Sequence, residues 1–371
     1  MRASIQKVPR LAISVFDAGE VRAAVAGGAD IIDCEDPRAE IGMFEPRVVT
    51  DIAYAVRQAS QSSIPTSANI GIPQVLKRAG QDRATMRSLF EIQAKAAQES
   101  LGLAAAMDVG DARPNIIKFE VDGLRPEDVK SYVSAVKSAI RNSRQFQHHL
   151  VVASCLELNR EVWEQRRVDK SVIAELLKLG EFFFDIHGDI NLNDYFTPEE
   201  VSKMMNSKSD HARVSLIEPS NPAALGLPKT MDDRLKFWVD CLTDGGADGV
   251  LIDTPIQAKV AKICLLIDQS NVTSGDAVSL VGTCTLNQLQ TFTEYCDYRG
   301  PETWLAGSIQ PNHAAQLATL RSLNVIMCRD AASEVAVSPY GASAGSARAS
   351  KRISIARVRS LAERIKGQGK S

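Results

Sequence analysis

Short apolar runs alternate with longer amphipathic segments along most of the chain. The runs are rich in β-branched residues and are bounded by Gly, Pro, Asn or Asp, which is typical of buried strands. The pattern predicts strands at residues 11–16, 30–34, 66–70, 115–121, 148–156, 249–254, 303–307 and 324–328.

Helical patterns occupy the intervals between these strands. We predict helices at residues 17–28, 46–59, 83–107, 125–142, 234–243, 285–298, 311–322 and 353–366. Asp17 is a typical N-cap of the first helix, and Gly27-Gly28 is a typical stop signal. Repeated strand–helix units predict a parallel sheet, because each crossover supplies a helix that covers it. Eight units favour the α/β class and a (β/α)8 TIM barrel. The dinucleotide-binding fold is disfavoured, because no GxGxxG motif follows the first strand.

The alternation stops between residues 158 and 230. This stretch is long, polar and mixed, and its part from 159 to 179 predicts a helix. We interpret residues 158–230 as an insertion after strand five, within one structural domain whose barrel parts are 1–157 and 231–371. Loops at the carboxyl ends of barrel strands tolerate such insertions.

Composition and charge exclude several classes of protein. The chain has 371 residues and a net charge of −2, with no strongly basic segment that would predict nucleic-acid binding. No apolar run is long enough to predict a membrane span, and the first ten residues lack the apolar core of a signal peptide. Seven cysteines without a CxxC pair predict free thiols and a cytoplasmic location. The five histidines show no metal-ligand spacing, so we expect neither a metal nor a cofactor. Barrels of this kind often bury apolar helix faces in homo-oligomers, so a homo-oligomer stays among the alternatives for this chain.

The strongest catalytic candidate is a lysine inside an apolar strand. In a barrel of this type the active site lies at the carboxyl ends of the strands. Lys118 lies in the run Ile116–Val121, and desolvation of an inward-facing lysine lowers its pKa and makes it an amine nucleophile or an acid/base group. The alternative is a structural ion pair with Asp253 or Glu35. Asp33 and Glu35 lie at the end of the second predicted strand, Asp253 lies on the sixth, and all three are candidate proton-transfer groups.

The ends of strands seven and eight are the usual phosphate site of this fold. Gly307 and Ser308 offer backbone N–H groups and a hydroxyl, and Arg329 could neutralise a phosphate. Further candidate substrate contacts are Arg38, Asn69 and Lys259. These residues predict a small phosphorylated metabolite as the partner, the alternative being a loop with solvated arginines.

Several segments in order resemble a known family. The first is Ala26–Asp33, followed by Asp36-Pro37 and Gly42. The others are Ala68–Gly71, Ile117-Lys118, Gly246–Thr254, Leu305–Ser308, and Arg329 with Ala331-Ala332. The set resembles the (5-formylfuran-3-yl)methyl phosphate synthases of methanofuran biosynthesis, over about residues 10–157 and 234–367.

The resemblance implies a (β/α)8 barrel and a lyase that condenses two molecules of glyceraldehyde 3-phosphate through a lysine Schiff base. It matches Lys118 to one family lysine and Asp253 to the family aspartate. Glu35 stands where the family has its Schiff-base lysine, and Gln257 replaces a second lysine. Glutamate cannot form an imine, so the family mechanism cannot run unchanged.

These observations favour a lyase or aldolase-like enzyme acting on a substrate of the triose phosphate class. In one version, Lys118 forms the imine in place of the missing lysine, with Lys259 assisting. In the other, Glu35 holds Lys118 protonated, and Lys118 acts as a general acid. Two alternatives stay open. One is a non-catalytic barrel that serves as a partner or scaffold subunit. The other is a metal-assisted aldolase, whose ligands would come from Asp33, Glu35, Asp36, Glu120, Glu157 and Asp253.

Overall fold

The structure is a computed structural model. It describes residues 8–35, 46–60, 64–69, 114–121, 126–142, 149–154, 162–169, 206, 211–218, 228–253, 284–307, 309–335 and 351–367. The predicted helix at 83–107 lies outside these residues, as do the side chains of Arg38, Gln257, Lys259 and Ser308.

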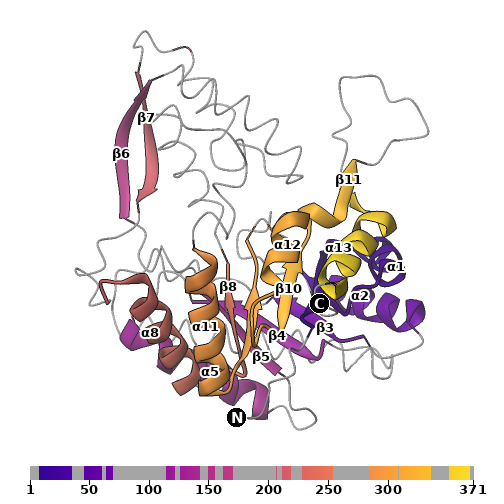
Figure 1. Cartoon of the computed structure of the whole chain (residues 1–371), viewed down its shortest axis with the longest axis horizontal. Coiled ribbons are helices and arrows are strands. Elements are labelled where there is room, and N and C mark those ends of the chain that lie inside the picture. The colour runs from indigo at the N-terminus through magenta and orange to yellow at the C-terminus, as the bar shows by residue number, and fades with distance from the viewer. Residues whose placement is uncertain are drawn as a thin grey trace.

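Parallel strands form the centre of the fold, closed into a barrel in the order β1-β10-β9-β8-β5-β4-β3-β2 (Figure 1). The strands are β1 (Arg10–Val15), β2 (Ile31–Cys34), β3 (Thr66–Asn69), β4 (Ile116–Glu120), β5 (His149–Ser154), β8 (Gly249–Ile252), β9 (Glu302–Leu305) and β10 (Val325–Cys328). β1 pairs with β2 on one side and with β10 on the other, which closes the ring. Each predicted strand overlaps one of these, and the parallel α/β class is confirmed.

Helices surround the strands. They are α1 (Ala18–Gly27), α2 (Pro46–Ala59), α5 (Pro126–Asn142), α8 (Met231–Asp244), α11 (Leu286–Arg299), α12 (Pro311–Leu317) and α13 (Ile355–Gly367). The side chain of Asp17 accepts hydrogen bonds from the backbone N–H groups of Gly19 and Glu20, and so caps α1 as predicted. α12 ends at Leu317, earlier than the predicted residue 322.

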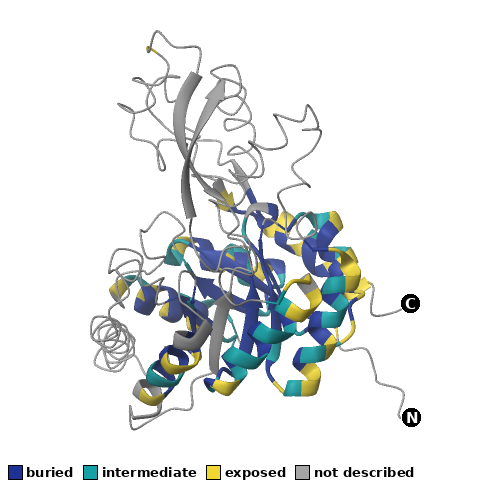
Figure 2. Cartoon of the chain, turned by 90° about the vertical axis from the view of Figure 1, so that its left-hand side faces the viewer, coloured by how far each residue is buried: buried dark blue, intermediate teal, exposed yellow. Residues whose placement is uncertain are grey.

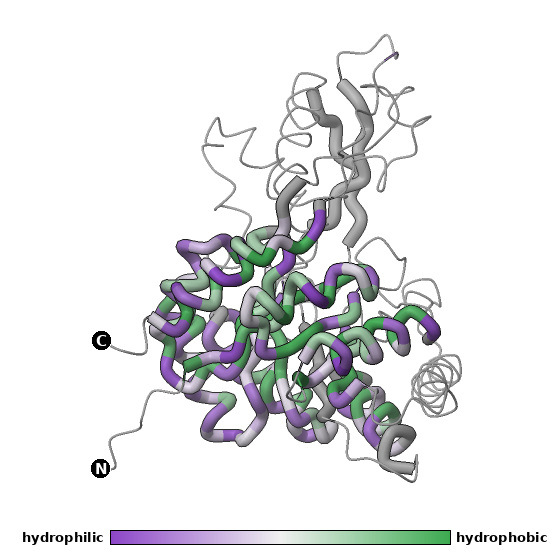
Figure 3. Tube along the Cα trace, turned by 90° about the vertical axis from the view of Figure 1, so that its right-hand side faces the viewer, coloured by the Kyte–Doolittle hydropathy of each residue, from purple (hydrophilic) through white to green (hydrophobic). Residues whose placement is uncertain are grey.

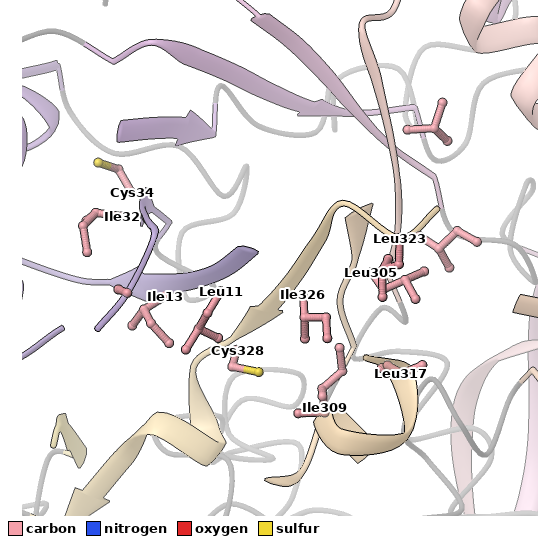
Figure 4. Packing of buried hydrophobic residues seen from close by; sticks show 14 of the residues in the cluster. Leu11, Ile13, Ile32, Cys34, Leu305, Ile309, Leu317, Leu323, Ile326 and Cys328 are labelled. Atoms are coloured by element: carbon pink, nitrogen blue, oxygen red, sulfur yellow. The ribbon is translucent and has the colours of Figure 1, made fainter. Parts of the chain in front are cut away.

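Two apolar layers hold this arrangement together. An outer layer joins the outward faces of the strands to the helices, and Figure 4 shows part of it around Leu11, Ile32 and Ile326. A second cluster fills the barrel interior and contains strand residues and Ala306, with no helix residue: Ala12, Ile31, Ile116, Leu251, Trp304, Ala306, Val325 and Met327. Successive strand residues therefore alternate between the two layers. The barrel strands whose burial is described are buried, and the helices expose polar outer faces (Figures 2 and 3).

The segment between β5 and β8 contains a separate pair of strands. β6 (Val162–Asp169) and β7 (His211–Glu218) form an antiparallel two-stranded sheet, in register from Val162↔Glu218 to Asp169↔His211. The predicted helix at 159–179 is therefore wrong where β6 lies. Val162 and Trp163 favour a strand, and the distant partner β7 supplies the cross-strand pairing that a local reading of the sequence misses.

Outside the barrel, the described residues also form a second small sheet. β11 (Ser333–Val335) pairs with β12 (Lys351–Ile353) after β10, and neither strand was predicted because each is too short to show a pattern. The five described cysteines are free thiols, as expected: Cys34, Cys241, Cys284, Cys296 and Cys328. No helix within the described ranges is both long and apolar enough to cross a bilayer.

We expect Gly27→Ala to lower the free energy of unfolding by about 1–3 kcal/mol, as overpacking does. A Cβ at Gly27 would meet the Val358 side chain, whose Cγ1 would lie 2.7 Å away, so α1 could no longer approach α13 as closely. Gly367→Ala is the matched control, since nothing lies within 4 Å of its added Cβ. Urea unfolding of both variants measures the difference, and equal stabilities would contradict this account of the α1–α13 contact.

Candidate active site

A buried lysine bridges two carboxylates inside the barrel. Lys118 of β4 donates a hydrogen bond from Nζ to Asp33 Oδ2 at 3.0 Å and a second to Glu35 Oε2. The Lys118 side chain is 3% exposed and that of Asp33 0%, whereas Glu35 keeps 20% of its side chain exposed. Asp33 lies near the carboxyl end of β2, and Glu35 follows its last residue. The predicted residues Asp33, Glu35 and Lys118 thus lie together near the carboxyl ends of the strands.

Two serines complete this arrangement. Ser14 Oγ donates to Asp33 Oδ2 at 3.0 Å, and Ser67 Oγ donates to Asp33 Oδ1 at 2.7 Å. The parallel register places Ser14 of β1 and Ser67 of β3 opposite Asp33, one on each side. We call Ser14, Asp33, Glu35, Ser67 and Lys118 the Lys118 cluster. Ser14 was not among the predicted site residues, although a small polar residue between the apolar Ile13 and Val15 is the signal of an inward-facing hydroxyl.

The charge state of Lys118 corrects one expectation. Desolvation alone would lower the pKa of Lys118, as the sequence analysis assumed. The charges of Asp33 and Glu35, and the hydrogen bonds from Lys118 to both, outweigh desolvation and raise this pKa well above its ordinary value. Lys118 is therefore an ammonium ion in the free protein, which favours its role as a general acid over that of a ready amine nucleophile.

The pKa of Glu35 is raised, whereas pairing with a lysine lowers the pKa of most carboxylates. Burial raises the pKa of Glu35 to about 7, the charge of Lys118 opposes the increase, and the charges of Asp33 and Asp253 add to it. Asp253 follows β8 and so lies within electrostatic reach of Glu35, as the strand-end position predicted. A carboxyl group that titrates near neutral pH is suited to give and take protons.

We expect the pKa of Glu35 to make the stability of the protein depend on pH. The folded-state pKa of about 7 lies above the ordinary 4.5, so between these values the folded protein binds more protons than the unfolded chain. The free energy of unfolding therefore falls as the pH rises through this window. Urea unfolding at about pH 5 and about pH 8 should show this fall in the wild type and a smaller fall in Glu35→Gln. Glu363→Gln, at an exposed site on α13, is the control. Equal pH dependence in all three proteins would contradict the assignment.

The predicted phosphate contacts are brought together only in part. Gly307 is buried at the end of β9, with a φ of 104° that favours glycine. Arg329 donates from Nη1 to the Ser14 carbonyl oxygen and to Glu20 Oε2, both at 2.9 Å, and from Nη2 to Glu20 Oε1 at 3.3 Å. The structure thus places Arg329 in a buried ion pair that the sequence analysis did not foresee. Its contact with phosphate stays a prediction.

Asn69 and part of the set of candidate metal ligands lie among the described residues, whereas Asp36 and Glu157 lie outside them. Asn69 is buried on β3, opposite Lys118 in the register of the β3–β4 pair. Within the described ranges, no three His, Cys, Asp or Glu side chains are grouped so that they could hold a metal ion. Two of the carboxylates that a metal-assisted reaction would use, Asp33 and Glu35, instead bind the ammonium group of Lys118.

A family comparison covers the part of the chain that contains the Lys118 cluster. Residues 11–157 match the family model of 4-HFC-P synthase. The match supports membership in that family. All five residues of the Lys118 cluster lie within the matched segment, and Asp253 lies beyond it. The family is one of enzymes, so the match supports an enzymatic function. No curated protein shows a significant sequence match to the chain.

Solved structures resemble the fold only distantly. The chain has 10% identity to 3-keto-L-gulonate-6-phosphate decarboxylase from Vibrio cholerae, with a TM-score of 0.41 over 97% of this chain and 99% of that one. It has 13% identity to phosphoribosyl anthranilate isomerase from Thermus thermophilus, with a TM-score of 0.38 over 96% and 98% of the two chains. A 2,3-dimethylmalate lyase gives 10% identity and a TM-score of 0.37, over 86% of this chain and 75% of that one.

Proposed function

We propose that the protein is a lyase of the 4-HFC-P synthase type that acts on a small phosphorylated carbonyl compound of the triose phosphate class. The observation that carries this proposal is the ammonium group of Lys118, held between Asp33 and Glu35 inside the barrel. As part of the proposal, the architecture is a (β/α)8 TIM barrel in which residues 158–230 are an insertion after the fifth barrel strand.

The arrangement suits chemistry at the carbon next to a carbonyl group. A carboxylate takes the proton from that carbon, and the C–H electron pair becomes the C=C bond of an enolate. The ammonium group of Lys118 donates a hydrogen bond to the enolate oxygen, where negative charge develops. The enolate then re-forms its C=O bond by expelling a leaving group from the next carbon, or attacks a second carbonyl group.

This route differs from an imine mechanism because no amine of the protein forms a covalent bond to the substrate. Glu35 replaces the family's Schiff-base lysine, and the raised pKa keeps Lys118 protonated. An ammonium group has no lone pair with which to attack a carbonyl carbon. Electrostatic stabilisation by Lys118 therefore takes the place of a covalent intermediate in the proposal.

Hydrogen exchange at the substrate tests the proposal. The purified protein is incubated with glyceraldehyde 3-phosphate in D2O, and the ¹H signal of the carbon next to the aldehyde is followed by NMR. We expect the signal to be lost faster than in the protein-free blank, and at the blank rate with Lys118→Met. A parallel sample is treated with borohydride and mapped by mass spectrometry, and we expect no adduct.

Each other outcome has a distinct meaning. A borohydride adduct on Lys118 would replace the enolate route by an imine route at the same site. No exchange and no adduct with folded wild-type protein would overturn the proposal and support a non-catalytic barrel. Exchange that a chelator abolishes would overturn the metal-free route in favour of a metal-assisted aldolase.

A further inference from the structure

The two carboxylates that share Lys118 differ in what else binds them. Both oxygens of Asp33 are occupied: Oδ1 accepts from Ser67, and Oδ2 accepts from Ser14 and Lys118. Asp33 has no exposed surface. Glu35 accepts a hydrogen bond from Lys118. Within the described part of the chain, no second hydrogen bond to Glu35 is found. Its side chain is 20% exposed, beyond the end of β2.

These differences separate what each carboxylate can do. A carboxylate that already accepts three hydrogen bonds and has no exposed surface cannot approach a substrate carbon. Its fixed oxygens can instead orient the group that they bind. Among the described residues, only Lys118 is found to donate to Glu35, and part of the Glu35 side chain is exposed, as a base that must reach a substrate proton requires.

We propose that Asp33, held by Ser14 and Ser67, is a positioning residue that fixes the direction of the Lys118 ammonium group, and that Glu35 is the catalytic base. This inference rests on the proposed function, and it gives different roles to two carboxylates that the sequence analysis treated alike. It also gives Ser14 and Ser67 a role in catalysis through Asp33.

The strand register explains why two serines are needed. Ser14 and Ser67 lie on the strands that flank β2, and each is opposite Asp33. Both are buried, so the loss of either hydroxyl leaves an oxygen of Asp33 with fewer donors and holds the carboxylate less firmly. Lys118 would follow that movement, because its Nζ is bound to Oδ2. Small displacements of a catalytic group reduce the rate strongly, by up to about 100-fold for 1 Å.

A double-mutant cycle tests the connection between Ser67 and Asp33. We expect Ser67→Ala to lower kcat on the order of tenfold with little change in KM, and to have no further effect in Asp33→Asn. Ser14→Ala should behave in the same way and serves as the second variant. Thr293→Ala removes a buried hydroxyl on α11 that bonds the Gln290 carbonyl, and should leave kcat unchanged. If the reductions in kcat caused by Ser67→Ala and Asp33→Asn multiply in the double variant, the proposal is overturned.

The pH profile distinguishes the base from the positioning residue. Within the described part of the chain, the charged groups that act on Glu35 are Asp33 of β2, Lys118 of β4, and Asp253 after β8. The acid limb of kcat/KM should move in Glu35→Asp and keep its midpoint in Ser67→Ala. The reverse result would make Asp33 the base and overturn the proposal.

A measurement that needs no turnover separates this inference from the proposed function. Competitive acetylation with mass spectrometry reports the pH at which Lys118 becomes reactive. We expect that pH to fall in Asp33→Asn and in Ser14→Ala/Ser67→Ala relative to the wild type. If it falls while the wild type catalyses no exchange, the positioning role holds and the proposed function fails. If exchange occurs but acetylation of Lys118 is the same in all proteins, the positioning role fails and the function stands.

Discussion

Lys118→Met is expected to reduce turnover by about 100- to 1,000-fold, as removal of a group that stabilises the developing oxyanion does. The same change should lower the free energy of unfolding by about 3–5 kcal/mol, because it leaves two carboxylates without the cation that compensates them. Asp33 is fully buried, so its charge cannot be solvated by water when Lys118 is gone. The loss of stability should be largest above neutral pH, where Glu35 is also ionised.

A second buried lysine provides the control for this prediction. Lys137 of α5 forms an ion pair with Asp248, and their side chains are 10% and 36% exposed. Lys137→Met should destabilise the protein, yet leave the activity of the folded enzyme unchanged because Lys137 belongs to the helix layer. Urea unfolding and steady-state assays at matched folded fractions measure both effects. Full activity in Lys118→Met would exclude Lys118 from the reaction.

The position of Lys118 could be predicted from the sequence, but its charge state could not. Alternation along β4 places Lys118 in the barrel interior, and Phe119 contacts Tyr132 of α5 on the opposite side. The direction of its pKa depends on Asp33 and Glu35, which lie 85 and 83 residues away in the chain. Local sequence shows burial, which lowers the pKa of a lysine, and does not show the carboxylates that raise it.

The same distinction explains which parts of the fold were predictable. The barrel strands carry apolar periodicity and turn residues within a short window, so their positions followed from the sequence. β6 depends on β7, whose partner residues are more than 40 positions away, and its helical prediction was wrong. The role of Ser14 likewise depends on the register between β1 and β2, which brings it opposite Asp33. Features that depend on pairing between distant segments require the structure.

The ion pair between Glu20 and Arg329 shows the same dependence on distant residues, and it gives the second large prediction. Glu20 of α1 was not predicted to have any role, yet it is 2% exposed and accepts four hydrogen bonds. The donors are the Phe16 N–H at 2.8 Å, Arg329 Nη1 at 2.9 Å, Arg329 Nη2 at 3.3 Å and the Ile353 N–H at 3.4 Å. Glu20 thereby joins the end of β1 to the end of β10 and to β12.

We expect Glu20→Ala to lower the free energy of unfolding by about 3–5 kcal/mol, because it leaves the guanidinium group of Arg329 buried without its counter-charge. The side chain of Arg329 is 12% exposed, so water cannot replace the carboxylate. Lys130→Ala is the control. Lys130 pairs with Asp244 at the surface, where the two side chains are 61% and 49% exposed, and its loss should cost at most about 1 kcal/mol. Chemical unfolding of both variants gives the comparison. A cost for Glu20→Ala as small as that for Lys130→Ala would mean that the pair does not hold the first and last strands of the barrel together. Arg329 would then be available for the phosphate contact that its position after β10 predicts.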